Sequence, residues 1–400
     1  MSPGAMLVVE THAPTRTRQR DADVGEAIPR LPDHLVVTHI LRSEHFDDPA
    51  DLARLPAVSR TMRDAVAETG LQFEELVENE AVELGCLSVL KRLQRGGRLS
   101  RQEYLCQAAA RSGQLEELQA LRENGCPWDT STSWAAARSG HLEVLQWARA
   151  NDCPWGRATC AFAAKGGHLE VLRWARANGC PWGKATCLEA AGGGHLEVLI
   201  WALANGCSCG EKEMLHWAAK NGHEAVVWAL IEKGANINEV GKDVTPLSIA
   251  AQEGHETVVR VLMEAGADAN KARDDGVTPL YIAAQKGHDA VVRALLEAGA
   301  DINTAWDNGA TPLYIAAQKG HETVVRALIE AGADVNTAWD NGATPLYIAA
   351  QKGHETVVRA LIEAGADVNT AWDNGATPLR IAAVNGHEAI VHILSDAGAA

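Results

Sequence analysis

The sequence predicts an all-α fold in which helix pairs stack into a solenoid, with short β-hairpin fingers in the C-terminal half. Two observations carry this prediction. The string T-P-L recurs with a period of 33, at Thr245, Thr278, Thr311, Thr344 and Thr377. Upstream, G-H-L-E-V-L recurs with a period of 27, at Gly140, Gly167 and Gly194. Units this short cannot bury an apolar face alone, so neighbouring units must stack.

One of the longer units shows why each element is expected. Thr344 is a good N-cap, and Pro345 suits the first helical position, where a missing N–H costs nothing. Gly353 provides the left-handed residue that ends this helix. Residues 357–362 then place apolar side chains at helical period, and D-N-G at 373–375 predicts a tight hairpin. In the shorter units, Thr132, Thr159 and Thr186 align with these threonines and are likewise expected to be N-caps.

The repeated pattern closely resembles the ankyrin repeat, G-x-T-P-L-x-x-A-A-x-x-G-H. It departs from that family where Tyr281, Tyr314 and Tyr347 replace the usual His after T-P-L. Counting the Gly that ends each first helix gives eleven units, of which the first six are short or degenerate. We place the short units, with their period of 27, in 71–235 and the regular units, with their period of 33, in 236–400.

The N-terminal residues do not follow the repeat. Residues 1–30 predict a disordered tail, and 31–70 resemble an F-box, the helical motif that docks on the adaptor subunit of a cullin–RING ubiquitin ligase. The docking positions carried by this resemblance are Leu31, Pro32, Leu35, Ile40, Leu41, Leu52, Leu55 and Val58. The alternative is a plain helical cap packed on the first repeat.

Partner contacts, by resemblance to the ankyrin family, come from the finger tips and the first-helix face. The matching positions are Asp274, Asp275, Tyr281, Gln285, Lys286, Asp307, Asn308, Tyr314, Gln318, Lys319, Asp340, Asn341, Tyr347, Gln351 and Lys352, with Asp373 in the last finger. Trp306, Trp339 and Trp372 occupy finger positions where the family usually has Asp. These tryptophans either anchor a partner or stack on the adjacent finger.

A second set of tryptophans belongs to the short units. Trp147, Trp174 and Trp201 follow one another in second helices at a spacing of 27, and Trp228 continues the spacing. We expect these four to be wedges between stacked units. Trp128, Trp155 and Trp182 stand in C-P-W corners, where they replace the missing finger by packing over the turn.

Histidines and cysteines also follow the repeat. One His follows the Gly that ends each first helix from His141 to His387, which suggests hydrogen bonds between units, as in the ankyrin family. The nine Cys follow the period of the short units rather than the C-x2-4-C pairs of zinc sites, so we interpret them as buried packing thiols. No catalytic or phosphate-binding motif is present.

The composition narrows the function. A net charge of −16 disfavours nucleic acid, and no stretch approaches the roughly 20 apolar residues of a membrane span. An odd number of Cys predicts reduced thiols in a cytoplasmic or nuclear setting. We therefore predict a monomeric, non-enzymatic protein-binding scaffold without cofactor or metal, acting as a ubiquitin-ligase substrate receptor if the F-box-like segment works. The alternatives are a scaffold with no ligase link and, ranked last, a metal-binding or redox protein using the Cys-rich half.

Overall fold

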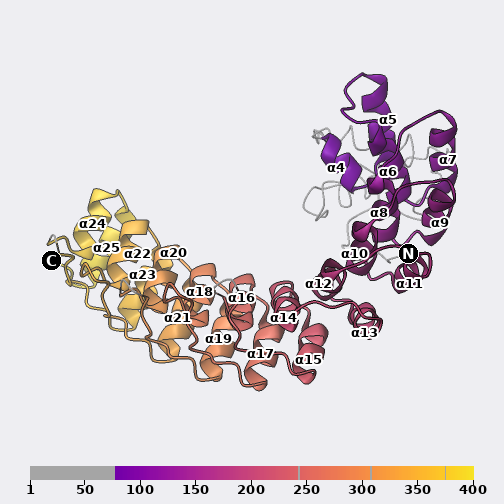
Figure 1. Ribbon diagram of the computed structural model, residues 1–400. Coiled ribbons are helices and arrows are strands. Elements are labelled where there is room, and N and C mark those ends of the chain that lie inside the picture. The colour runs from indigo at the N-terminus through magenta and orange to yellow at the C-terminus, as the bar shows by residue number, and fades with distance from the viewer. Residues whose placement is uncertain (1–76, 242–243, 307–308, 374) are drawn as a thin grey trace, which may run out of the picture. The chain divides into compact units, whose positions relative to one another are not determined.

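The computed structural model describes residues 77–241, 244–306, 309–373 and 375–400, and the helices there form eleven consecutive pairs (Figure 1). The F-box-like segment lies outside the described residues. The six short pairs are α4 Glu78–Glu83 and α5 Leu87–Arg95, α6 Glu103–Arg111 and α7 Leu115–Glu123, α8 Thr130–Arg138 and α9 Leu142–Ala150, α10 Arg157–Lys165 and α11 Leu169–Ala177, α12 Lys184–Gly192 and α13 Leu196–Ala204, and α14 Glu211–Lys220 and α15 Glu224–Glu232. The five regular pairs are α16 Pro246–Glu253 and α17 Glu256–Glu264, α18 Pro279–Lys286 and α19 Asp289–Glu297, α20 Pro312–Lys319 and α21 Glu322–Glu330, α22 Pro345–Lys352 and α23 Glu355–Glu363, and α24 Pro378–Val384 and α25 Glu388–Asp396.

The chain divides into two compact units, one ending at Leu99 and the other spanning Ser100–Ala400. The described part of the first unit contains the pair α4 and α5, and the second unit contains the other ten pairs. The change from short to regular repeats near residue 236 therefore lies inside one compact unit.

The regular units fold as predicted. The Thr344 hydroxyl accepts a hydrogen bond from the Tyr347 N–H at 3.2 Å, and Pro345 occupies the first turn of α22. Gly353 ends the helix with φ of +84°, in the left-handed region that glycine tolerates best. In α23 the apolar stripe, Val357, Val358 and Leu361, is fully buried against the neighbouring helices.

The short units begin their first helices differently, so the predicted N-cap role of their threonines was wrong. The N-caps are Asp129, Gly156 and Gly183, and the three threonines are third residues of the helices. The short C-P-W corner starts each helix earlier than a finger does, which turns the threonine inward and buries it. Thr159 still stabilises the N-terminus of α10, since its hydroxyl accepts a hydrogen bond from the Gly156 N–H at 3.3 Å.

Stacking also differs between the two halves. In the regular half, first helices pack on first helices and second helices on second helices. In the short half from α6 to α13, extensive packing between units is confined to the first helices. Losing the finger shortens the connection between one unit and the next.

The fingers are turns rather than the predicted β-hairpins. In the finger of residues 339–343, the Trp339 carbonyl accepts from the Gly342 N–H at 2.8 Å, and the Trp339 N–H donates to the Ala343 carbonyl at 2.9 Å. No strand extends from any finger in the described ranges, where the pairing is limited to an isolated bridge between Gly241 and Val244. The bond between Trp339 and Ala343 closes the finger, and the finger stems also bond to the neighbouring units along the solenoid.

Two polar ladders connect the regular units. The Asn303 side chain accepts from the Asp334 N–H at 3.2 Å, and Asn336 repeats this contact with the Asp367 N–H at 2.9 Å. On the second helices, Arg326 pairs with Glu322 at 2.9 Å in its own helix and with Glu363 of the next unit at 3.2 Å. Arg260 and Arg293 form the same pairs, but all these side chains are exposed, so each pair stabilises only slightly.

Candidate functional site

The finger tryptophans pack on the preceding unit. The ring of Trp339 lies 5.5 Å from that of Tyr314 at a tilt of 55°, and Trp306 and Trp372 repeat this contact with Tyr281 and Tyr347. The indole N–H of Trp306 also donates to the Asp275 carbonyl in the preceding finger. All three indoles are partly buried. This packing fits a structural role between neighbouring units.

The tyrosines of the predicted partner-binding set lie inside the solenoid. Tyr281, Tyr314 and Tyr347 are each only 2% exposed, because the first helix turns them inward and an indole covers them. Burial raises the pKa of Tyr281 to about 12 and also raises the pKa of Tyr314 and Tyr347. These rings contribute to the core and present almost no surface to a partner.

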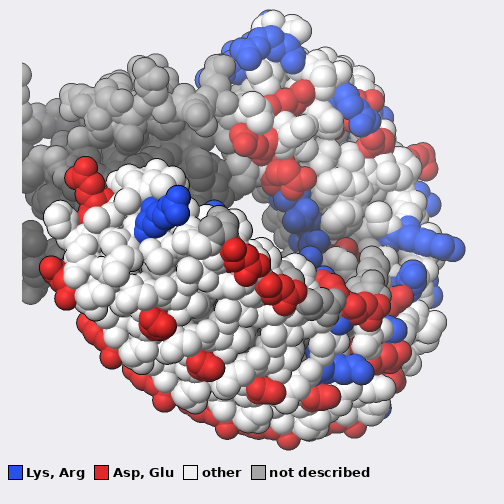
Figure 2. Space-filling view, turned by 90° about the vertical axis from the view of Figure 1, so that its left-hand side faces the viewer, with Lys and Arg blue, Asp and Glu red and all other residues white. Residues whose placement is uncertain are grey.

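The lysines of the same set are exposed. Lys286, Lys319 and Lys352 end α18, α20 and α22, and none of them forms a hydrogen bond or ion pair with a described residue. The neighbouring Gln285, Gln318 and Gln351 are partly buried. The face shown in Figure 2 carries more acidic than basic side chains, and acidic ones recur along its lower edge. These three ammonium groups thus recur in successive units at one repeat position, and no described residue engages them.

The other residues of the predicted partner-binding set differ in their exposure and in their contacts. The Asn341 side chain accepts from the Ala343 N–H at 3.1 Å, and its carbonyl accepts from the Asp373 N–H at 3.1 Å, so Asn341 shapes the finger. Asp274, Asp275, Asp340 and Asp373 are all exposed, and Asp275 also accepts from the Val277 N–H at 3.2 Å. Asp307 and Asn308, and the eight F-box-like docking positions, lie outside the described residues.

The short half is organised by pairs of tryptophans. The rings of Trp128 and Trp147 meet edge to face at 5.8 Å, and the pairs Trp155–Trp174 and Trp182–Trp201 repeat this geometry at 5.7 Å. An arginine covers each corner ring: Arg122 lies 4.2 Å from the ring centre of Trp128, with Arg149 and Arg176 at the equivalent positions. The predicted packing of corner tryptophans over the turn is confirmed.

Trp228 does not continue this row, and its prediction as a wedge was wrong. The unit that contains it is one residue longer, because Gly222 follows Gly194 at a spacing of 28 instead of 27. A spacing of 27 therefore turns Trp228 by about 100° around the helix axis. Ala229 takes the inner position. Trp228 instead takes the repeat position that Ile200 has in the preceding second helix, where Ile200 is exposed, and Trp228 is itself 37% exposed.

The predicted hydrogen bonds of the histidines between units are confirmed. Nε2 of His354 lies 3.0 Å from the Gln318 carbonyl of the preceding unit, and the ring covers Gly320. The same contact recurs from His141 through His387. Because a carbonyl only accepts, Nε2 carries the proton. Burial lowers the pKa of His168, which favours the neutral ring.

Most cysteines are packing residues, as predicted. Cys153, Cys160, Cys180 and Cys187 are at most 1% exposed, and burial raises the pKa of Cys153 to about 12. In the part of the chain that the structure covers, no three His, Cys, Asp or Glu side chains are placed to hold a metal ion. No helix within those ranges has the length and apolar character needed to cross a membrane.

The comparison with protein families agrees with this architecture. A model described as ankyrin repeats (3 copies) matches residues 160–241, 186–273, 247–339 and 336–400. Together these matches extend over more than half of the chain. A comparison with curated proteins found no match. The pairs α6–α7 and α8–α9 precede the matched residues. As in the matched units, a glycine of positive φ follows each of their first helices, and the histidine contact is present. The chain therefore belongs to the ankyrin-repeat family.

Proposed function

We propose that this protein is a non-enzymatic scaffold that holds another protein on the regular half of its solenoid. The observation that carries this proposal is the row of exposed lysines, Lys286, Lys319 and Lys352, which no described residue engages. Most other polar side chains of the repeated motif form internal contacts. An ammonium that recurs in three successive units without an internal partner is available to the carboxylates of a bound protein.

The repeat spacing suggests the form of the bound segment. Helices packed side by side lie about 8–10 Å apart, so the row presents one cation about every 10 Å. An extended chain in the polyproline II conformation has three residues per turn and rises about 3.1 Å per residue, so its every third side chain lies on one face at about that spacing. We therefore expect an extended segment with Asp or Glu at every third position. The near-identity of the units suits a partner that is itself repetitive.

The test is reversal of the charge of the row. We expect Lys286→Glu, Lys319→Glu and Lys352→Glu together to weaken partner binding about tenfold or more, since each exposed pair contributes up to about 1 kcal/mol. The partner is first identified by cross-linking to the intact chain, and its affinity is then measured at two salt concentrations.

A matched control makes the same change of charge elsewhere. Arg157→Glu, Lys184→Glu and Lys233→Glu alter exposed residues at the starts of α10 and α12 and directly after α15, of which Lys184 forms an exposed pair with Glu213 at 3.9 Å. This control should keep wild-type affinity. Equal losses in both variants would attribute binding to overall charge, and full binding by the row variant would exclude the row as the site.

We further propose that residues 31–70 connect this scaffold to a ubiquitin ligase. The F-box-like pattern of this segment supports the proposal, and the free thiols of the described cysteines support a cytoplasmic or nuclear setting. We expect the full chain to bind the adaptor subunit of a cullin–RING ligase and the double variant Leu35→Ala, Leu41→Ala to lose that binding. If the wild-type chain does not bind the adaptor while it still binds its partner, the protein is a scaffold with no ligase link.

A further inference from the structure

Two exposed apolar residues stand at one repeat position on the successive second helices α13 and α15 (Figure 1). Ile200 on α13 is 47% exposed, and Trp228 on α15 is 37% exposed. Each follows the glycine that ends its first helix by six residues. At this position the next four units carry an arginine: Arg260, Arg293, Arg326 and Arg359. The two apolar residues therefore replace a cation that the regular units place at their surface.

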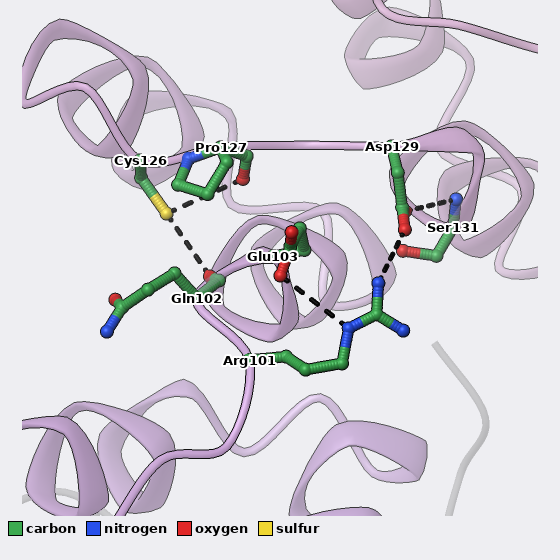
Figure 3. A network of polar contacts seen from close by, with 7 residues as sticks. All are labelled: Arg101, Gln102, Glu103, Cys126, Pro127, Asp129 and Ser131. Atoms are coloured by element: carbon green, nitrogen blue, oxygen red, sulfur yellow. Dashed lines mark hydrogen bonds and ion pairs between the residues drawn. The ribbon is translucent and has the colours of Figure 1, made fainter. Parts of the chain in front are cut away.

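Exposed arginines join carboxylates of neighbouring units along this solenoid. Arg260 pairs with Glu256 of its own helix and with Glu297 of the next unit, both at 2.9 Å. Figure 3 shows Arg101, just before α6, reaching in the same way to Asp129 at the start of α8, 3.1 Å away. An apolar residue in place of such an arginine removes the cation that the carboxylates share.

The carboxylates that flank such an arginine are still present around the apolar residues. Glu224 precedes Trp228 by four residues, the spacing of the acidic partner within one helix of the regular units. Glu264 holds the position of the acidic partner in the next unit, and Glu232 holds that position relative to Ile200. All three are exposed, and none forms an ion pair with a described residue. Since neither α13 nor α15 contains Lys or Arg, these helices supply no cation of their own.

We infer that α13, α15 and the end of α17 form a docking surface for a segment of another protein that carries an arginine beside an aliphatic residue. This surface, which we call the Trp228 surface, comprises Ile200, Glu224, Trp228, Glu232 and Glu264. A guanidinium stacks on the Trp228 indole and pairs with Glu224 and Glu264, as an arginine of the regular units pairs with its two carboxylates. The aliphatic side chain covers Ile200 on the neighbouring second helix, about 8–10 Å away.

Charge selects this occupant over a second copy of the chain. The chain carries a net charge of −16. A two-fold contact through the Trp228 surface would also bring its own carboxylates against those of the other copy. The Trp228 surface is opposite in sign to the lysine row of the regular half, so the two sites take different chemistry. The lysine row takes carboxylates, and the Trp228 surface takes a guanidinium.

The test selects peptides from a random phage-displayed library on the intact chain and removes those that also bind Trp228→Arg. That substitution restores the arginine of the regular units and gives Glu224 and Glu264 an internal cation. We expect the peptides retained by the wild-type chain alone to carry arginine beside Leu, Ile or Val. The most enriched peptide, synthesised with a fluorescent label, should bind Trp228→Ala about tenfold more weakly in anisotropy titrations. It should bind the double variant Glu224→Gln, Glu264→Gln about fivefold more weakly.

Trp217→Ala is the matched control, because Trp217 is 44% exposed but lies on the first helix α14, and this variant should bind the peptide as the wild-type chain does. The inference is overturned if no peptide distinguishes the wild-type chain from Trp228→Arg, or if those that do lack a basic residue. A wild-type dimer that dissociates in Trp228→Arg, measured by analytical ultracentrifugation, would assign the surface to a second copy instead. Circular dichroism confirms that each variant is folded.

Discussion

Gly320→Ala is expected to lower the free energy of unfolding of its repeat junction by about 3 kcal/mol or more. Gly320 has φ of +78°, where a residue with a Cβ costs roughly 1–2 kcal/mol. In addition, the new Cβ would lie 2.6 Å from Nδ1 of His354, a distance that forces the ring to move. The displaced ring loses its hydrogen bond to the Gln318 carbonyl, which contributes about 1 kcal/mol. Native-state hydrogen exchange over α20 to α22 measures the effect.

The same repeat offers a control for backbone strain. Gly332 follows α21 with φ of +93°, and a Cβ there would meet nothing within 4 Å. Gly332→Ala should therefore cost only about 1–2 kcal/mol. Similar losses in the two variants would show that the histidine contact contributes little. Each unit touches only its neighbours, so the change in exchange should be centred on this junction.

Trp339→Ala is expected to lower the free energy of unfolding by about 2 kcal/mol. A fully buried Trp costs roughly 3–5 kcal/mol when truncated, and Trp339 is only partly buried. The substitution uncovers Tyr314, whose ring lies 5.5 Å away and is otherwise 2% exposed. Urea unfolding followed by circular dichroism and by tyrosine fluorescence measures the loss.

Trp228→Ala provides the matched comparison, because Trp228 is 37% exposed on a second helix. Its substitution should change stability by no more than about 0.5 kcal/mol. Unchanged stability in Trp339→Ala, combined with lost affinity for the partner in the triple variant of Trp306, Trp339 and Trp372, would reverse the interpretation. It would make these indoles partner anchors rather than links between units.

The sequence predicted the units because the features that define them are local. Thr344 caps its helix through a residue three positions later, and Gly353 acts through its own φ angle. The histidine contacts were also predictable, since one residue type at one position in every unit implies the same neighbour each time. The error at Trp228 shows the limit of this reasoning, because one added residue turned a repeated position from the inner to the outer face of its helix.

The N-caps of the short units show a second limit. Aligning the short units with the regular ones predicted Thr132, Thr159 and Thr186 as N-caps. A corner without a finger begins the first helix earlier, so these threonines lie inside it. The fingers likewise had the turn sequence of a hairpin and became turns without strands. Their backbone and side-chain amides bond to the next unit, a partner that no single unit contains.

By itself, the sequence determined the number of units, their two lengths and the apolar face of each helix, because periodicity and backbone preference act within a unit. Only the tertiary structure decided which side chains of the repeated motif remain exposed to solvent. Tyr314 and Lys319 belong to one helix, yet the tyrosine is buried under the indole of the following finger and the lysine faces solvent. Cys126 and Cys180 occupy equivalent positions and differ in access to solvent. Exposure depends on the unit stacked next to each residue, and that neighbour is set by packing rather than by local sequence.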